Sequence, residues 1–129
     1  MSPTGRQASS TGPAQLPPPG IVGLDPSWSR LVTAPDHAGI NVGWHIVDTH
    51  HGRVTSEPAT LTVLCVHGNP SWSFLWRHLA AAAPDSVRVI AVDQLDMGFS
   101  ERTGRLRRLG DRVDDLANLT EVLGLSGDV

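Results

Sequence analysis

The chain has 129 residues, enough for one small domain with a real core, and a formal net charge of −3. This balance gives no reason to expect nucleic acid or an anionic membrane as a partner. No apolar run approaches the ~18 residues that a membrane span needs, and the N-terminus lacks the pattern of a secretory signal. The single cysteine, Cys65, leaves neither a disulfide nor a cysteine-based metal site. We therefore expect a cytoplasmic protein.

Residues 1–29 are predicted to form a disordered tail ahead of a domain that covers residues 30–129. Residues 1–20 are rich in Ser, Thr, Pro, Gly and Gln, and such a segment buries too little apolar surface to offset its ordering entropy. A proline-rich ligand for a partner domain is the alternative, and the composition favours the solvated tail.

Four segments are predicted to be strands. Residues 30–34 form a short first strand, and residues 40–48 alternate between apolar and mixed positions, as in an outer antiparallel strand. A polar turn over residues 49–60 follows. Residues 61–66 are apolar on both faces, which is typical of an internal parallel strand, and residues 87–92 form a second apolar strand.

Two helices are predicted, which makes the fold class α/β. The first covers residues 72–83, with Ser71 as its N-cap. Its inward stripe is expected to contain Leu75, Trp76, Leu79, Ala82 and Ala83. The crossover from strand 61–66 through this helix to strand 87–92 implies a parallel, right-handed pair.

The second helix is predicted from residue 106 to residue 123, with Gly124 as its stop. Its apolar stripe is expected to contain Leu106, Leu109, Val113, Leu116, Leu119 and Leu123. Its solvated outer face is expected to contain Arg107, Arg108, Asp111, Arg112, Asp114, Asp115 and Glu121.

The tetrapeptide His67-Gly68-Asn69-Pro70 joins an apolar strand to a helix. A strand, a glycine turn and a helix together place backbone N–H groups at the mouth of a site. In the simplest interpretation Gly68 only supplies the bend and Asn69 caps the helix. Together with the residues that follow it, Ser-Trp-Ser-Phe-Leu-Trp-Arg, the motif resembles the oxyanion-loop region of α/β-hydrolase-fold enzymes, most closely the haloalkane dehalogenases and their relatives.

This resemblance implies strands 1–4 and the first two helices of an α/β-hydrolase sheet, an incomplete domain that stops just before the nucleophile elbow. It also implies that Asn69 donates to an oxyanion or a leaving anion, through its backbone N–H and its side-chain amide. His67, Gly68 and Pro70 would support the loop, with His67 orienting the turn rather than acting as a base.

The segment Asp93-Gln94-Leu95-Asp96-Met97-Gly98-Phe99-Ser100 resembles the Asp-x-x-Gly-x-Gly-x-Ser loop of the same family. Asp96 stands at a position where the family usually has glycine, and Asp tolerates a left-handed backbone better than most residues. Asp93 and Ser100 are expected to brace the loop through hydrogen bonds, without a catalytic role.

The implied activity of the full-length parent is attack by an Asp carboxylate on a small apolar substrate, followed by hydrolysis of the ester. No metal or organic cofactor is implied, and none of the six histidines has a helical metal-ligand spacing. No G-x-S-x-G elbow occurs in the sequence. The chain therefore lacks the nucleophile, the acid and the base, and further domains after Val129 are expected.

Two alternatives remain open. One is a relative that decarboxylates β-lactones in olefin biosynthesis. The other is a truncated, non-catalytic gene product or a small binding module.

Overall fold

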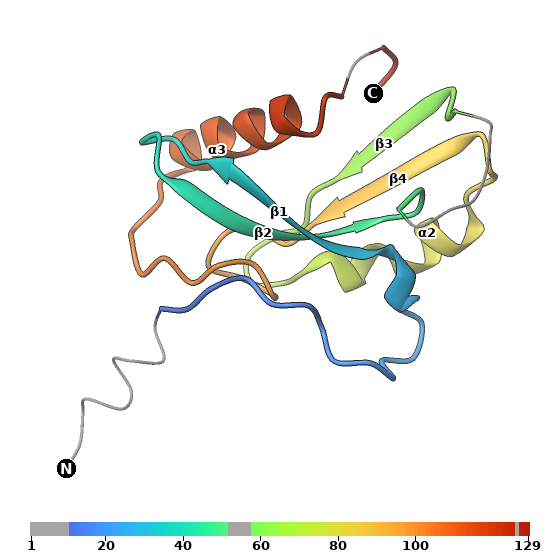
Figure 1. The fold of residues 1–129 in the computed structure, drawn as a ribbon, viewed down its shortest axis with the longest axis horizontal. Coiled ribbons are helices and arrows are strands. Elements are labelled where there is room, and N and C mark those ends of the chain that lie inside the picture. Colours follow the sequence, from blue (N-terminus) through green and yellow to red (C-terminus); the bar gives the residue numbers. More distant parts are fainter. Residues whose placement is uncertain (1–10, 52–57, 126) are drawn as a thin grey trace.

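The computed structural model describes residues 11–51, 58–125 and 127–129. The described strands form one mixed four-stranded sheet in the order β1-β2-β4-β3 (Figure 1). They are β1 (Ser29–Pro35), β2 (Asn41–Asp48), β3 (Leu61–Cys65) and β4 (Val87–Val92). The described helices are α2 (Arg77–Ala82) and α3 (Leu109–Val122), and the 3-10 turns are η1 (Pro26–Trp28) and η2 (Ser73–Trp76). The predicted α/β class is thus confirmed.

The sheet combines an antiparallel half with a parallel pair. β1 pairs antiparallel with β2, and β2 pairs antiparallel with β4. β3 and β4 are parallel, with Val63 opposite Val89, as the crossover predicted. One strand environment differs from expectation, since β2 is internal rather than outer. β3 has the apolar pattern of an internal strand and lies at the edge of the described sheet, as expected for an incomplete sheet. β2 is internal because the crossover brings β4 alongside it.

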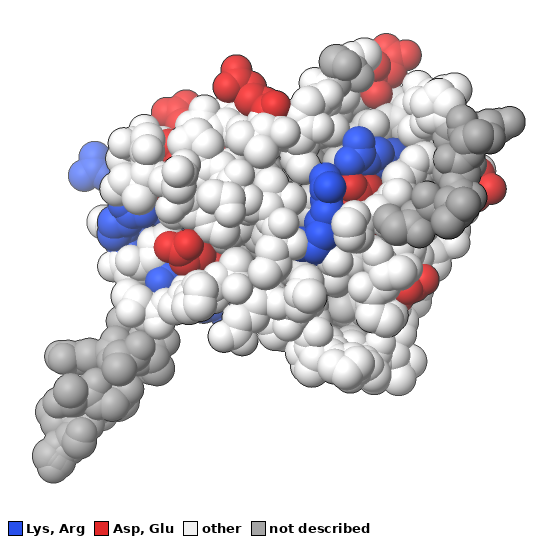
Figure 2. All heavy atoms as spheres, in the orientation of Figure 1, with Lys and Arg blue, Asp and Glu red and all other residues white. Residues whose placement is uncertain are grey.

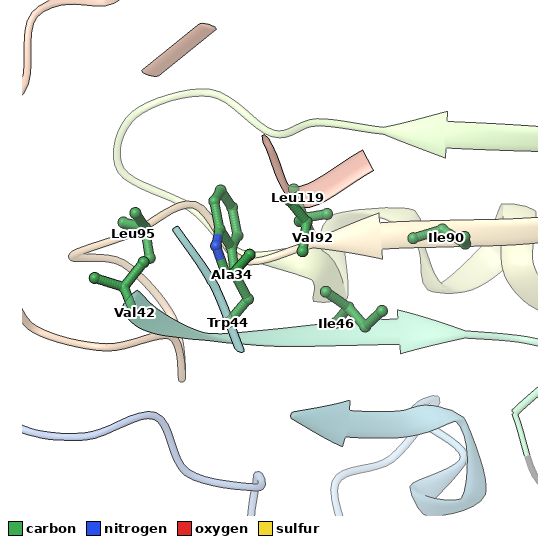
Figure 3. Packing of buried hydrophobic residues seen from close by; sticks show 8 residues of the cluster. All are labelled: Ala34, Val42, Trp44, Ile46, Ile90, Val92, Leu95 and Leu119. Carbon is green, nitrogen blue, oxygen red and sulfur yellow. The ribbon is translucent and has the colours of Figure 1, made fainter. Parts of the chain in front are cut away.

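The core has two layers because successive residues of β4 point to opposite faces of the sheet. Ile90 and Val92 pack with Trp44 of β2 and Leu119 of α3 on one face (Figure 3). Val89 and Ala91 pack on the other face with Ala80 of α2. The sheet is therefore covered on both faces, by α3 on one side and by α2 with η2 on the other (Figure 1).

The first predicted helix begins as a 3-10 turn, and this shifts its buried side. η2 has about three residues per turn, so the stripe expected for a 3.6-residue period does not apply to it. Leu75 and Leu79, which were expected to face inward, are exposed, whereas Trp72 and Phe74 pack against the core.

α3 is shorter than the predicted helix, and only its second half packs as expected. Leu116, Leu119 and Leu123 contact the core, whereas Leu106 and Leu109 are 88% and 80% exposed. Arg107 and Asp115, predicted on the solvated face, are buried, because each neutralises the other within one hydrogen-bonded cluster. Among the described residues, no helix is long and apolar enough to cross a membrane.

Residues 11–29, for which the composition predicted a disordered tail, make defined contacts. Gly12 and Arg102 exchange two main-chain hydrogen bonds of 2.9 and 2.8 Å, and the Gln15 N–H donates to the Phe99 carbonyl at 2.9 Å. Leu24 is buried against the α2 side of the sheet. Main-chain hydrogen bonds to the loop after β4 therefore hold this segment, whose side chains bury little apolar surface. Residues 1–10, and part of the predicted polar turn, lie outside the described residues.

Candidate functional site

The loop after β3 is anchored by the imidazole of His67. The ring Nδ1 lies 2.6 Å from the Gly68 carbonyl oxygen, which can only accept, so Nδ1 carries the proton. The main-chain N–H of Gln94 donates to Nε2 at 2.9 Å, and the Gln94 side-chain amide donates to the His67 carbonyl at 2.6 Å. Both ring nitrogens are therefore occupied. His67 holds the turn through these bonds and has no free nitrogen to act as a base.

Asn69 lies exposed on this anchored loop, just beyond the carboxyl end of β3. In the part of the chain that the structure describes, neither its main-chain N–H nor its side-chain amide has a hydrogen-bond partner. The N-caps of η2 and α2 are Trp72 and Trp76, and neither makes a side-chain capping bond. The interpretation of Asn69 as a helix cap is therefore wrong, and so is that of Ser71 as the N-cap. The donors of Asn69 remain available to a bound group.

Asp93 ties the loop after β3 to the loop after β4. Its Oδ1 accepts from the Ser73 N–H at 2.7 Å, and its Oδ2 accepts from the Phe99 N–H at 2.8 Å and from His45 Nδ1 at 2.7 Å. Burial by itself would raise the pKa of Asp93, but these hydrogen bonds more than offset burial and hold the pKa below its usual range.

Ser100 adds a second brace to the same loop. Its hydroxyl donates to the Asp93 carbonyl at 2.5 Å and accepts from the His45 N–H at 2.9 Å. The bracing roles predicted for Asp93 and Ser100 are confirmed.

Asp96, Gly98 and Gly104 in the loop after β4 have a left-handed backbone. Gly98 has φ +54°, and a Cβ added there would collide with the Asp93 carboxylate and lie 2.8 Å from the Trp72 Cβ. Asp96 has φ 68°, as its place in the motif predicted. Its carboxylate accepts from the Thr103 and Gly104 N–H groups at 2.6 and 3.2 Å, which fixes the turn that follows.

A shallow groove of about 500 Å³ lies beside Asn69. We call it the arginine groove, and its polar lining consists of Asn69, Asp96, Arg102, Arg105, Arg107 and Arg112. The loops after β3 and β4 and the first turn of α3 thus meet at one place. The exposed amide of Asn69 and the half-buried guanidinium groups at that place can bind an anion.

Comparison with known proteins gives partial matches to two kinds of enzyme. No protein-family model matches the chain. A cis-3-alkyl-4-alkyloxetan-2-one decarboxylase from Xanthomonas campestris is 39% identical, over 52% of this chain and 25% of that protein. Haloalkane dehalogenase 2 from Mycobacterium tuberculosis is 37% identical, over 54% of this chain and 28% of that protein. The chain thus spans about a quarter of the length of the curated relatives it matches.

Solved structures agree on the fold. The haloalkane dehalogenase DpaA from Paraglaciecola agarilytica superposes with a TM-score of 0.66 at 25% identity, over 90% of this chain and 39% of that one. A thermophilic esterase from Thermogutta terrifontis superposes with a TM-score of 0.63 at 27% identity, over 78% of this chain and 34% of that one. The chain is a partial homologue of the haloalkane dehalogenase-like α/β-hydrolases.

Beneath the arginine groove of this dehalogenase-like chain lies a buried ionic cluster. Arg107 donates to Asp115 at 2.8 Å and to Asp36 at 3.2 Å, and its side chain is fully buried. Burial would lower the pKa of Arg107, but the charge of Asp115 and the hydrogen bonds to Asp36 and Asp115 raise it.

Asp36, His37 and Asp115 have the spacing of a metal site. Arg107 already pairs with both carboxylates, and Arg105 pairs with Asp36 as well, so a cation would have to displace these guanidinium groups. Sequence analysis missed this cluster. Asp36 lies in the turn between β1 and β2, and its partners Arg105 and Arg107 are 69 and 71 positions away in the chain, so no local spacing could reveal the cluster.

A second hollow of about 490 Å³ lies at the opposite end of the sheet, beside Asp48, Arg88 and Arg30. Arg88 forms a forked pair with Asp48 at 3.0 and 2.7 Å, and Arg30 lies 3.4 Å from the same carboxylate. Burial would raise the pKa of Asp48, but the pairing with Arg88 lowers it. This pair is internally neutralised, and the face drawn in Figure 2 carries small mixed groups of charge rather than one broad field.

Proposed function

We propose that this chain supplies the oxyanion-loop part of a haloalkane dehalogenase-like enzyme, in which Asn69 stabilises an oxyanion or a leaving anion. One observation carries the proposal. Asn69 holds two unpartnered donors on a loop that His67, Gln94 and Asp93 fix from below. A donor held in place before the reaction has little reorganisation cost when charge develops beside it.

An amide is a suitable donor for this purpose. It supplies an N–H to an anion without bringing a charge that would have to be desolvated. Removing one such donor typically costs about 10²–10³ in rate. His67 is assigned no proton transfer, because both of its ring nitrogens already have partners.

In the proposed reaction a carboxylate of the parent enzyme attacks an electrophilic carbon of a small apolar substrate. The carbon–halogen bond breaks as the ester bond forms, and the halide leaves with the electron pair. Water, deprotonated by a base, then hydrolyses the ester and regenerates the carboxylate. The present sequence contains no G-x-S-x-G elbow, so we expect the 129-residue chain alone to turn over neither haloalkanes nor esters.

A second candidate is action on a β-lactone. The decarboxylase from Xanthomonas campestris, named for a cis-3-alkyl-4-alkyloxetan-2-one, is slightly more similar to this chain than haloalkane dehalogenase 2 is, at 39% against 37% identity. In that reading Asn69 would donate to the carboxylate oxygen that develops as the ring opens.

A chimera tests both candidates. Residues 1–129 are joined to the corresponding remainder of haloalkane dehalogenase 2 from Mycobacterium tuberculosis, and turnover of 1-bromobutane is compared with turnover of a cis-dialkyl β-lactone. Asn69→Ala should lower kcat/KM by about 10²–10³, whereas the exposed Asn41→Ala should leave it unchanged. Full activity of the Asn69→Ala chimera on both substrates would reject the proposal.

A further inference from the structure

The arginine groove holds two guanidinium groups with no carboxylate partner. Arg102 donates to the Ser100 and Gly98 carbonyls at 3.1 and 2.6 Å, and Arg112 donates to the Leu95 carbonyl at 3.0 Å. Within the described residues neither of them forms a salt bridge. A guanidinium has five N–H donors, so each of these side chains retains several N–H groups that donate to no acceptor among the described residues.

Both guanidinium groups are nevertheless held in place. The main chain of Arg102 is paired with Gly12, and its side chain spans the loop that Asp93 and Ser100 brace. Arg112 lies in the first turns of α3 and reaches back to the loop after β4. Holding a cation by neutral carbonyls leaves its charge intact, so the groove remains positive at this point.

The nearby acids are already in use. Asp36 and Asp115 accept from buried Arg107, and Asp36 also accepts from Arg105 at 2.7 Å. The Asp96 carboxylate accepts from the Thr103 N–H at 2.6 Å and lies 3.4 Å from Arg107 Nε. These three carboxylates offset three of the four groove arginines, so one net positive charge remains among these seven side chains.

We propose that the arginine groove binds a carboxylate group of the substrate, through Arg102 and Arg112, beside the Asn69 donors. This rests on the proposed function and modifies its substrate from a wholly apolar molecule to one with an apolar reacting end and a carboxylate at the other end. A planar carboxylate fits the fork of a guanidinium, and a single surplus positive charge matches one negative charge better than the two of a phosphate. The Asp96 carboxylate, at the rim, disfavours more highly charged ligands.

Binding of butyrate to the ¹⁵N-labelled 129-residue chain tests the proposal. In two-dimensional NMR, butyrate should shift the Arg102 and Arg112 Nε–H signals and the Asn69 N–H signals, and butyramide, which has the same shape without charge, should not. Arg112→Gln and Arg102→Gln should each weaken binding by about tenfold, the value expected for losing a charged hydrogen bond. Arg108→Gln is the matched control, since it removes the same charge at the start of the same helix but outside the groove.

Several outcomes would overturn the inference. These are equal shifts with butyramide, equal weakening by Arg108→Gln, or no shift in the groove at all. Arg102→Lys and Arg112→Lys keep the positive charge but lose the paired N–H groups of the guanidinium. These variants test carboxylate binding if a Gln variant fails to fold. Wild-type affinity in both Lys variants would reject fork recognition. A chain that binds butyrate while the Asn69→Ala chimera keeps full activity would refute the proposed function and leave the anion site standing.

Discussion

The loops at the carboxyl ends of β3 and β4 and the outer edge of β3 border the same sheet but are held in opposite ways. At the loops, Asp93, His67 and Asp96 satisfy main-chain donors that lie far apart in sequence. Along the edge of β3, one main-chain hydrogen bond within the described residues reaches the strand from outside, from the Thr62 N–H to the Asp128 carbonyl at 3.1 Å.

The candidate site takes its geometry from the loops and not from the outer edge of β3. Asn69 is placed by a buried polar network that joins the two loops directly, and that network makes no use of the outer edge of β3. Within the described residues most main-chain groups on that edge have no partner, and Leu61 and Val66 beside it are exposed, which is the usual state of a surface that pairs with another strand. A substitution in the network should therefore leave the edge of β3 unchanged, and a substitution at the edge should leave the network unchanged.

The largest expected effect comes from removing the centre of the network. Asp93→Ala leaves the Ser73 and Phe99 N–H groups and His45 Nδ1 without an acceptor in the protein interior. Each buried unsatisfied donor costs about 1–3 kcal/mol, so we expect the free energy of unfolding to fall by about 3 kcal/mol or more. Urea denaturation followed by near-UV circular dichroism measures the change.

The exposed Asp114→Ala is the control for this experiment and should stay within about 0.5 kcal/mol of the wild type. Asp93→Asn keeps the shape and one acceptor oxygen, so its loss should be smaller than that of Asp93→Ala. Equal stability of Asp93→Ala and Asp114→Ala would mean that the network does not position the loops.

A somewhat smaller effect is expected at Gly98. Alanine there would be forced into a left-handed backbone and would drive its Cβ into the Asp93 carboxylate. The expected loss is about 2–3 kcal/mol, the range for strain at a special backbone position combined with overpacking. Gly110→Ala, in α3 with open space around its Cβ position, should instead gain up to about 1 kcal/mol from helix propensity. Thermal melting of the two variants measures both changes. If both melting temperatures rose, or both fell, the prediction would be wrong.

The contrast also separates what the sequence could predict from what it could not. The strand at Val87–Val92 and the parallel pair follow from local apolar patterns and from the crossover between the two strands. The loop role of Asp93 follows from the resemblance, because its partners Ser73 and His45 lie 20 and 48 positions away. The resemblance, rather than periodicity, pointed to Asn69. It also suggested that Asp96 would be left-handed, and the structure agrees.

The failures have a common physical cause. Arg107 and Asp115 carry the polarity of a solvated face, and only the distant Asp36 makes their burial favourable. The stripe containing Leu106 and Leu109 has a helical period, but period alone does not say whether a partner surface covers it. Composition predicted disorder for residues 11–29 because it counts side chains, whereas Gly12 is held by main-chain pairing.

The smallest expected effect concerns the outer edge of β3. Leu61 begins this strand and is 40% exposed, so two copies of the chain can pair along it and bury this side chain. Leu61→Lys places a charge on the edge and prevents that burial. Burying the exposed 40% of a leucine is worth about 0.6–1.2 kcal/mol per copy, so the dimer dissociation constant should rise by about tenfold. The free energy of unfolding of the monomer should change by no more than about 0.5 kcal/mol, because the residue is already half in water. Sedimentation equilibrium over a range of concentrations measures the association.

Leu106→Lys, at a more exposed leucine outside the sheet, is the matched control. If both variants reduce association equally, exposed apolar surface in general drives association, and strand pairing along the edge of β3 does not.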